Sequence, residues 1–509
     1  MQRSTVFFLI LFLSFGLALA QPEVSVVADN VATGSPLYYD HTPNVARSSN
    51  GDLVAVWKSA DNQVVFSKYD PSFMTWSPAV PISNAGDQAL KAGIAADDNG
   101  NLYCTWQQRE TSGEDWAIFF SKYDGANWTT PVNLTGNDAE NEECGIAVNS
   151  LGHVFVAWNT DAEPDSSEWV LCIKSEDGGS TWSNPDTLSS NEGIIGGTST
   201  TSGRPVLAKA AGGKMVCAWH EEPDGHPQRE SFIAQYDGAS WSDEIVYIDV
   251  ADSANSMYPT IAADSDDNIY MMYVSFISVE EVKMLKKAWG DAAWPNEPSV
   301  LFSDPQVTKP NLVIDSNDDM YVIFRRDNAA DTTYGLEEEA YMTSDDLGVT
   351  WSDQVRLSRE NYDAGYGSVA LRPSGEGVDF LWRESYVPNS DDADTTAILH
   401  ARINTLTSIE GQNRTVLKDF QLQQNYPNPF NPSTQITFNI PQAGIFELAV
   451  YDLTGRKIRV LESGKLTAGQ HTAEWNAVNE SGRKAASGIY FYQLKGKNIS
   501  LTKKMVLVK

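Results

Sequence analysis

The chain has 509 residues, with 36 Lys and Arg against 68 Asp and Glu, and a formal net charge of −32. Apolar residues make up 41% and aromatic residues 11%, which excludes disorder throughout and predicts two or three packed domains. The acid excess excludes a nucleic-acid partner, because such binding needs basic surface to meet phosphates.

The charge is uneven along the chain. Residues 411–509 hold 13 Lys and Arg against 6 Asp and Glu, a net +7, which leaves −39 for the remainder. A change of sign this large predicts two domains with different roles.

The N-terminus predicts export. Arg3 precedes an apolar run from Val6 to Leu17 that ends in Ala18-Leu19-Ala20, which indicates a signal peptide over residues 1–20. The run is shorter than the roughly 18 apolar residues of a membrane-spanning helix, and no other stretch reaches that length, so no transmembrane anchor is expected.

Residues 21–406 contain an internal repeat. A short apolar strand, a polar turn and a second strand ending in an aromatic residue recur seven times, and the aromatic residues are Trp57, Trp106, Trp158, Trp219, Tyr273, Phe324 and Trp382. A period of about 50 residues, all strand, predicts an all-β propeller of four-stranded blades. Seven repeats favour seven blades, and six is the alternative. The spare strand Glu23–Ala28 is expected to pair as the missing strand of the last blade and to close the ring.

Two segments share the pattern S-x-D-x-G-x-T-W. They are Ser175, Asp177, Gly179, Thr181, Trp182 and Ser344, Asp346, Gly348, Thr350, Trp351. Both resemble the Asp-box, or BNR repeat, of the sialidase-like β-propellers. We expect a structural role, in which Asp accepts backbone N–H bonds, Gly takes a left-handed conformation and Trp packs between blades. The resemblance implies that these boxes lie away from the active face.

After a linker over residues 407–424, short strands separated by turns predict a small antiparallel Ig-like β-sandwich over residues 425–509. The segments NYPNPFNP (425–432), VYDLTGRKIRVL (450–461), SGIYFYQL (487–494) and the terminal KKMVLVK resemble the type A C-terminal sorting domain of the type IX secretion system. The resemblance implies that the type IX machinery is a partner and that a Gram-negative bacterium exports the protein through the periplasm to its surface or medium. An ordinary accessory module is the alternative.

Candidate binding residues gather at one mouth of the predicted channel, where the loops before the first strands and after the second strands of the blades converge. They are Lys91, Glu143, Arg204, Tyr258, Lys309, His220, Glu221, Arg325 and Arg383. Arginine and lysine in such a place suit a carboxylate or sulfate. The alternative is that these charges are solvated and only prevent association.

The sialidase resemblance suggests further roles at this mouth. Arg204, Arg325 and Arg383 would supply an arginine clamp, and Tyr366 with Glu384 the nucleophile pair. The early Phe-Arg-Ile-Pro motif of that family is absent, however, so the catalytic pattern is not matched and enzyme activity stays open.

No metal or other cofactor is expected, with calcium as the one candidate. The turns Asp264–Asn268 and Asp315–Asp319 have alternate oxygen ligands that would suit Ca²⁺. Asp and Asn are also the usual turn formers, and no bidentate Glu follows.

The sequence thus predicts an exported propeller that binds a glycan or another extracellular polymer. A glycoside hydrolase of sialidase-like type and a purely structural surface protein are the alternatives.

Overall fold

The computed structural model describes residues 23–508 apart from 32–36, 38–42, 74, 111–112, 137–138, 162–168, 190–202, 222–227, 248–254, 277–279, 296–297, 305–306, 328–335, 360–361, 373–376, 387–395, 405–420, 423–424, 426–427, 429, 441–443, 454–455, 467–468, 481 and 497–498. The predicted signal peptide and most of the predicted linker lie outside the described residues. The described chain forms two compact units, one within residues 20–406 and one within residues 407–509.

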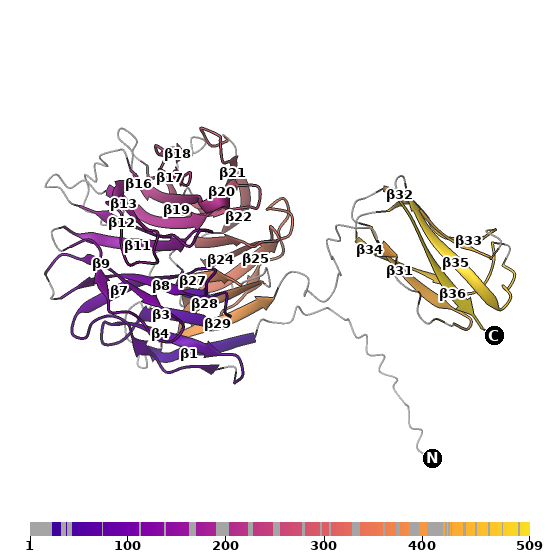
Figure 1. Ribbon diagram of the computed structural model, residues 1–509, viewed down its shortest axis with the longest axis horizontal. Coiled ribbons are helices and arrows are strands. Elements are labelled where there is room, and N and C mark those ends of the chain that lie inside the picture. Colours follow the sequence, from indigo (N-terminus) through magenta and orange to yellow (C-terminus); the bar gives the residue numbers. More distant parts are fainter. Residues whose placement is uncertain are drawn as a thin grey trace, which may run out of the picture. The chain divides into compact units, whose positions relative to one another are not determined.

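The first unit is a seven-bladed propeller, as predicted, and each blade is one antiparallel sheet (Figure 1). Blade 1 consists of β2 (Val45–Arg47), β3 (Leu53–Lys58), β4 (Val64–Asp70), β5 (Thr75–Trp76) and β6 (Val80–Pro81). Blade 2 consists of β7 (Gln88–Ala96), β8 (Leu102–Arg109), β9 (Ala117–Tyr123) and β10 (Val132–Asn133). Blade 3 consists of β11 (Asn141–Val148), β12 (Val154–Thr160), β13 (Trp169–Ser175) and β14 (Asp186–Thr187).

Blades 4 to 6 have four strands each. Blade 4 consists of β15 (Gly203–Lys209), β16 (Met215–Glu221), β17 (Glu230–Tyr236) and β18 (Ile245–Tyr247). Blade 5 consists of β19 (Asn255–Ala263), β20 (Asn268–Phe276), β21 (Glu280–Ala288) and β22 (Ser299–Asp304). Blade 6 consists of β23 (Thr308–Ile314), β24 (Met320–Asp327), β25 (Glu337–Ser344) and β26 (Val355–Arg356).

Blade 7 closes the ring with both ends of the domain. It joins β27 (Tyr362–Leu371), β28 (Gly377–Tyr386) and β29 (Thr396–Asn404) to β1 (Glu23–Val31), the N-terminal strand. The pairing of β1 with β29 runs from Glu23 opposite Arg402 to Val31 opposite Thr396, with two register shifts. The prediction of a borrowed closing strand is therefore confirmed, and seven blades replace the six-bladed alternative.

The propeller core lies between blades. One cluster of buried apolar side chains sits at each interface of neighbouring blades, including the interface of blade 7 with blade 1. The repeated aromatic residues of the second strands are almost fully buried there, with exposures of 0–2%. Each blade is thus held by the aromatic residues that mark the repeat.

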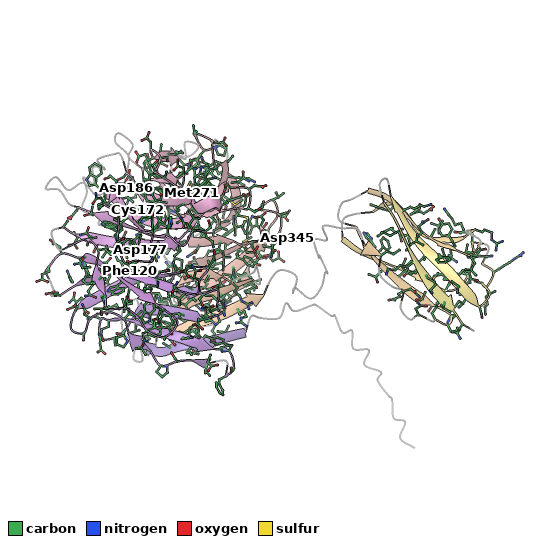
Figure 2. All side chains as sticks on the ribbon, viewed as in Figure 1. Phe120, Cys172, Asp177, Asp186, Met271 and Asp345 are labelled. Atoms are coloured by element: carbon green, nitrogen blue, oxygen red, sulfur yellow. The ribbon has the colours of Figure 1, made fainter. Side chains whose placement is uncertain are left out.

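Both Asp-box segments form tight turns that contact the preceding blade. Asp177 Oδ1 accepts from Thr181 N at 2.8 Å, and Asp346 Oδ1 accepts from Thr350 N at 2.8 Å. The hydrogen bonds from the hydroxyl and the backbone N–H of Thr181 lower the pKa of Asp177 to about 2. Gly179 has a φ of 92°, and a Cβ there would lie 2.3 Å from the Phe120 ring of blade 2. Figure 2 labels Phe120 and the Asp-box residue Asp177.

The C-terminal unit is a two-sheet sandwich, as predicted. Its sheets are β30 (Gln421–Leu422), β31 (Thr434–Ile440) and β34 (Gly469–Trp475), and β32 (Gly444–Tyr451), β33 (Lys457–Leu466), β35 (Gly488–Gly496) and β36 (Ile499–Leu507). Trp475, Phe438 and Tyr492 lie at the centre of its apolar core.

The turn between the first two strands of blade 6 differs from its counterparts. In blades 2 and 5, an Asn side chain donates to the turn aspartate, from Asn101 to Asp97 at 2.7 Å and from Asn268 to Asp264 at 2.8 Å. Blade 6 has Asp319 at that position, a carboxylate facing the carboxylate of Asp315. Burial and the charges of Asp315 and Asp345 raise the pKa of Asp319 to about 7.

Asp319→Asn is expected to stabilise the propeller above neutral pH. In the unfolded chain Asp319 loses its proton near pH 4, whereas in the folded protein it keeps the proton up to about pH 7. Asp319 therefore lowers the free energy of unfolding by a growing amount as the pH rises from about 4 to about 7. The unfolding midpoint of D319N should rise by about 1–3 °C at pH 8 and change little at pH 4. The reverse exchange in blade 5, Asn268→Asp, serves as the control and should lower the midpoint at pH 8; equal effects of D319N at both pH values would contradict the account.

Candidate functional site

The first strands of blades 2 to 7 each carry a β-bulge at the same place. The pairing register shifts there, and one residue in each bulge adopts a left-handed backbone with φ between 47° and 63°. These residues, which we call the bulge ring, are Lys91, Glu143, Arg204, Tyr258, Lys309 and Tyr366. The sequence predicted these residues just before the first strands. They lie inside those strands, which begin one to four residues earlier.

The local sequence favours these bulges. Proline follows the ring residue in three blades, at Pro205, Pro259 and Pro310. Proline has no N–H for a sheet ladder and is tolerated within a sheet at edges and bulges. A left-handed conformation at a non-glycine residue costs on the order of 1 kcal/mol, and such strain gathers at functional sites. The same left-handed conformation recurs in six blades, which indicates that the side chains at these positions have a functional role.

Members of the bulge ring contact one another across blade boundaries. Lys91 Nζ lies 3.2 Å from Glu143 Oε1, and Arg204 Nε lies 3.4 Å from Glu143 Oε2. The Arg204 guanidinium is 5.7 Å from the centroid of the Tyr258 ring. Four consecutive blades are therefore linked through their ring residues.

Tyr366 is approached by two basic side chains. Lys309 Nζ lies 5.1 Å and the Arg383 guanidinium 4.5 Å from the centroid of its ring. Tyr366 is buried, whereas the Arg383 side chain keeps 15% of its surface exposed. The buried Tyr366 ring thus contacts the Lys309 amine and the Arg383 guanidinium and helps to fix their positions.

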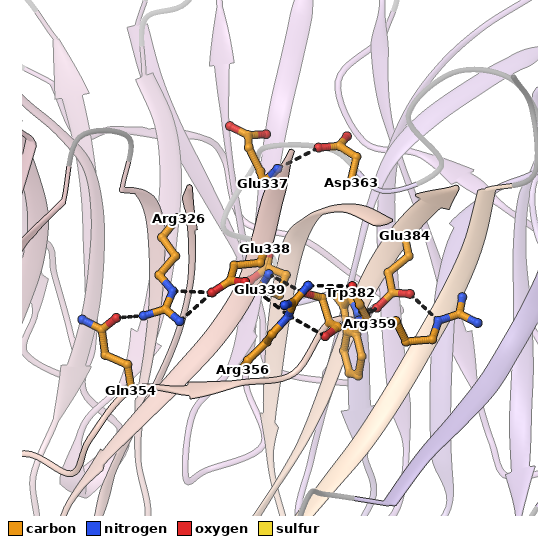
Figure 3. Close-up of polar contacts among 11 residues, drawn as sticks. Arg326, Glu337, Glu338, Glu339, Gln354, Arg356, Arg359, Asp363, Trp382 and Glu384 are labelled. Carbon is orange, nitrogen blue, oxygen red and sulfur yellow. Dashed lines mark hydrogen bonds and ion pairs between the residues drawn. The ribbon is translucent and has the colours of Figure 1, made fainter. Parts of the chain in front are cut away.

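Acidic side chains hold the two arginines of blades 6 and 7. Arg325 Nη2 lies 2.5 Å from Glu337 Oε1, and Arg383 Nη2 lies 3.4 Å from Asp363 Oδ2. The backbone N–H of Glu337 donates to Asp363 at 3.3 Å, which joins the two blades (Figure 3). The arginines are therefore oriented before any ligand arrives.

Glu339 is the carboxyl group beside the Tyr366–Gly367 peptide. Its Oε1 accepts from Gly367 N at 2.9 Å, and the side chain is 1% exposed. No hydrogen-bond partner is found for its Oε2 within the described residues. We call Lys309, Arg325, Glu337, Glu339, Tyr366 and Arg383 the blade 6–7 cluster.

Two members of this cluster have strongly shifted pKa values. Burial, reinforced by the charges of Arg325 and Arg204, lowers the pKa of Lys309 to about 6. Burial raises the pKa of Glu339 to about 8. At neutral pH the amine is therefore mostly uncharged and the carboxyl mostly protonated.

The remaining predicted site residues lie deeper. His220 is fully buried and meets the Tyr258 ring edge-on at 5.7 Å between centroids, and Glu221 is 4% exposed. Glu384 is also fully buried, and its carboxylate accepts from Trp382 Nε1 at 2.9 Å and from Arg359 Nε at 2.6 Å (Figure 3). These bonds commit Glu384 to the packing of blade 7, so Glu339 takes the place expected for Glu384 beside Tyr366.

Sequence reasoning missed Glu337, Glu339 and Asp363. The signal was present in the run Glu337-Glu338-Glu339 at the start of a third strand, where alternation directs the first and third side chains to the same face. Only the fold brings the start of β25 beside the bulge of blade 7.

A cavity of about 310 Å³ occupies the channel on the other side of the bulge ring. In blades 2 to 7 its lining residues follow the bulge and extend toward the turn after the first strand, as Ile94–Asp98 and Val206–Lys209 do. The walls are mostly Val, Ile, Leu and Ala. The charged ring and the apolar cavity therefore occupy opposite ends of the channel.

Within the described ranges, no group of three or more His, Cys, Asp or Glu side chains is arranged to hold an ion, and calcium at the blade 5 and 6 turns stays an untested prediction. The four cysteines are buried. No helix among the described residues is long and apolar enough to cross a membrane.

Comparison with protein families identifies the C-terminal unit. Residues 424–509 match the model named secretion system C-terminal sorting domain. These residues are a type IX sorting domain. The sorting domain directs the protein to secretion or to the outer surface, as the sequence predicted, and implies interaction with the secretion machinery. No curated protein sequence matches the chain.

The propeller resembles solved structures at low sequence identity. A polysaccharide lyase of family PL25, an ulvan lyase bound to -[GlcA(1-4)Rha3S]-, is 11% identical, covers 75% of this chain and 98% of its own, and has a TM-score of 0.52. The Hadza microbial sialidase Hz136 is 14% identical, covers 69% and 73%, and has a TM-score of 0.42. Penicillium chrysogenum α-L-arabinanase, complexed with arabinobiose, is 14% identical, covers 62% and 93%, and has a TM-score of 0.40. At these identities the likeness concerns the fold alone.

Gly367→Ala is expected to disturb the blade 6–7 cluster. A Cβ at Gly367 would lie 2.7 Å from both Glu339 Oε2 and Ile323 Cδ1, so the buried carboxyl must move. We expect a loss of about 1–3 kcal/mol in the free energy of unfolding, measured by denaturant titration. Gly290→Ala is the matched control, because no atom lies within 4 Å of a Cβ at that position, and it should change the free energy of unfolding little. An unchanged free energy of unfolding in G367A would contradict the close packing of Glu339.

Proposed function

We propose that the exported propeller binds an anionic polysaccharide at the channel mouth that carries the bulge ring. The observation that supports this is the gathering of Lys91, Arg204, Arg325 and Arg383 on rigid bulges and second strands of a domain that is otherwise strongly acidic. Guanidinium groups bind carboxylates and sulfates through two parallel hydrogen bonds.

Acidic side chains at the mouth hold these cationic groups in fixed orientations. Glu143 lies between Lys91 and Arg204, and Glu337 and Asp363 each hold one arginine. A preoriented guanidinium loses less side-chain entropy on binding, so a charged ligand gains more from each contact. The partly exposed Tyr258 adds an aromatic face, on which a sugar ring can pack.

The cellular destination agrees with such a ligand. The sorting domain sends the protein to the surface or the medium, where polysaccharides are available. The ulvan lyase of similar fold is bound to a sugar chain with a carboxylate and a sulfate. Recognition of an acidic glycan is the function that these observations favour together.

Binding should depend on the two arginines of blades 6 and 7. Calorimetric titration of the mature chain with oligogalacturonate or dextran sulfate should show affinity that falls with salt, and neutral dextran should not bind. Arg383→Ala and Arg325→Ala should each weaken binding by about 10–100-fold. Lys209→Ala, at the cavity end of the channel, is the control and should leave affinity unchanged. Binding that ignores both arginine substitutions would contradict the proposed site, and silence toward every acidic glycan would favour the structural role.

A sialidase-like hydrolase is the second candidate, favoured by Tyr366 beside Arg383 and the buried Glu339. The mature chain should then hydrolyse a fluorogenic sialoside, with the rate lost in Tyr366→Phe. No release of the fluorophore by the folded protein would remove this candidate and leave the binding proposal intact.

A further inference from the structure

Blade 7 carries a buried carboxylate at a place where the other blades are apolar or aromatic. Asp379 stands three residues before the repeated aromatic residue of its second strand and is fully buried. The residues at this position in blades 1 to 6 are Val54, Tyr103, Phe155, Val216, Tyr270 and Tyr321. A buried carboxylate is costly unless it is paired, and the repeat packs well without one. The role of Asp379 therefore lies in its polar partners.

Asp379 fixes a histidine of the neighbouring strand. Its Oδ1 accepts from His400 Nε2 at 2.9 Å, and Arg47 of blade 1 donates from Nε to Oδ2 at 2.7 Å and from Nη2 to Oδ1 at 3.0 Å. Burial opposes ionisation, but the hydrogen bonds from His400 and Arg47 hold the pKa of Asp379 well below its usual range. The ionised carboxylate can only accept, so Nε2 carries the proton of a neutral His400 and Nδ1 has a lone pair.

That lone pair meets a serine hydroxyl on the closing strand β1. Ser25 Oγ lies 3.1 Å from His400 Nδ1, and Trp76 Nε1 of blade 1 donates to the same oxygen at 3.2 Å. The Ser25 proton is therefore directed to the imidazole, and either ring nitrogen can serve as a base when the other is held by a carboxylate. Asp379 is fully buried, His400 is 3% exposed and Ser25 is partly exposed. The member of the relay that solvent reaches best is thus the nucleophile.

A cavity lies beside this serine, between β1 and blade 1. Its volume is about 490 Å³. Its lining residues include Val27, Trp57, Val65 and Pro78. Trp76 belongs both to this wall and to the hydrogen bond with Ser25, so the cavity and the hydroxyl share one side chain. Mostly apolar walls with one reactive polar group suit an apolar acyl or aryl ester.

We propose that Ser25, His400 and Asp379 form a serine-hydrolase site for carboxylic esters with an apolar acyl group. Ser25 is the nucleophile and His400 the general base, and Asp379 is a positioning residue that holds the imidazole in the required tautomer. This site is separate from the proposed glycan mouth, because Asp379 lies near the start of β28 and Arg383 nearer its end.

The reaction balances with one water. Ser25 Oγ attacks the carbonyl carbon of the ester while its proton passes to His400 Nδ1. The bond from that carbon to the alkoxy oxygen then breaks, and the Nδ1 proton leaves with the alcohol. Water attacks the acyl-serine and gives a proton to Nδ1, and the break of the acyl bond returns this proton to Ser25 Oγ and releases the carboxylic acid.

The test uses the mature chain with p-nitrophenyl butyrate and octanoate, and separately with a fluorophosphonate. We expect release of p-nitrophenol and a single phosphonate adduct, located on Ser25 by mass spectrometry of the peptides. Ser25→Ala should lose the adduct and reduce hydrolysis to the rate without protein. Ser77→Ala is the matched control, because Ser77 lines the same cavity but its hydroxyl donates to Pro78 O at 3.2 Å, and the rate should not change.

The roles of the other two residues are separated by kinetics. Glutamine in His400→Gln can still bond Asp379 but has no basic nitrogen, so kcat should fall by at least about 100-fold. Asp379→Asn should lower kcat and leave KM nearly unchanged, since it disturbs the tautomer of His400 and not the cavity. A residue that only joined the blades would change the unfolding midpoint without this split between kcat and KM.

Two results would overturn the proposal. One is a parent chain that neither hydrolyses the esters nor takes the phosphonate on Ser25, and the other is hydrolysis that persists in Ser25→Ala. Either would leave the network as a clasp that closes the ring of blades. Labelling of the parent chain needs no variant, so the test stands even where a substitution lowers the unfolding midpoint.

Discussion

The constraint on which the candidate site depends is a backbone bulge repeated around the propeller. Six first strands admit one extra residue in a left-handed conformation, and the side chains at these positions meet across blade boundaries. A regular strand would alternate its side chains strictly between the two faces of the blade. The bulge interrupts that alternation at the same depth in each blade, and the aromatic interfaces between blades keep the strained backbone in place.

The two ends of the channel are consequently different in character. One end carries the charged ring, with arginines oriented by acids, and the other is an apolar cavity of about 310 Å³. Burial shifts the pKa values of Lys309 and Glu339 toward their neutral forms, and the charges of Arg325 and Arg204 add to the shift of Lys309. The same group of residues therefore combines charged side chains with two buried groups that are shifted toward their neutral forms. The sorting domain supplies export and is a separate compact unit.

The architecture was readable from the sequence because it repeats. Aromatic residues about 50 positions apart, such as Trp106 and Trp158, predicted the blades, and the orphan strand at Glu23 predicted the closure of the ring. The sorting domain was recognisable from its segments in order. Both signals are local or periodic, so they need no knowledge of contacts between distant residues.

The site was readable only in part. Its ring positions were found, because they stand at fixed places in the repeat, and Pro205 or Pro310 after a charged residue would have revealed the bulge. Glu384 was expected beside Tyr366, but it is bonded to Trp382 and Arg359, and Glu339 from the neighbouring blade lies there instead. The pKa of Lys309 depends on burial and on arginines 16 to 105 positions away, which no local pattern encodes.

The most direct test of the central claim is an experimental structure of the mature chain with a bound acidic oligosaccharide. The account predicts the sugar at the bulge ring, with a carboxylate or sulfate oxygen about 3 Å from the guanidinium of Arg383 or Arg325. A ligand seated in the apolar cavity at the other end of the channel, or on the rim of the blades, would contradict it.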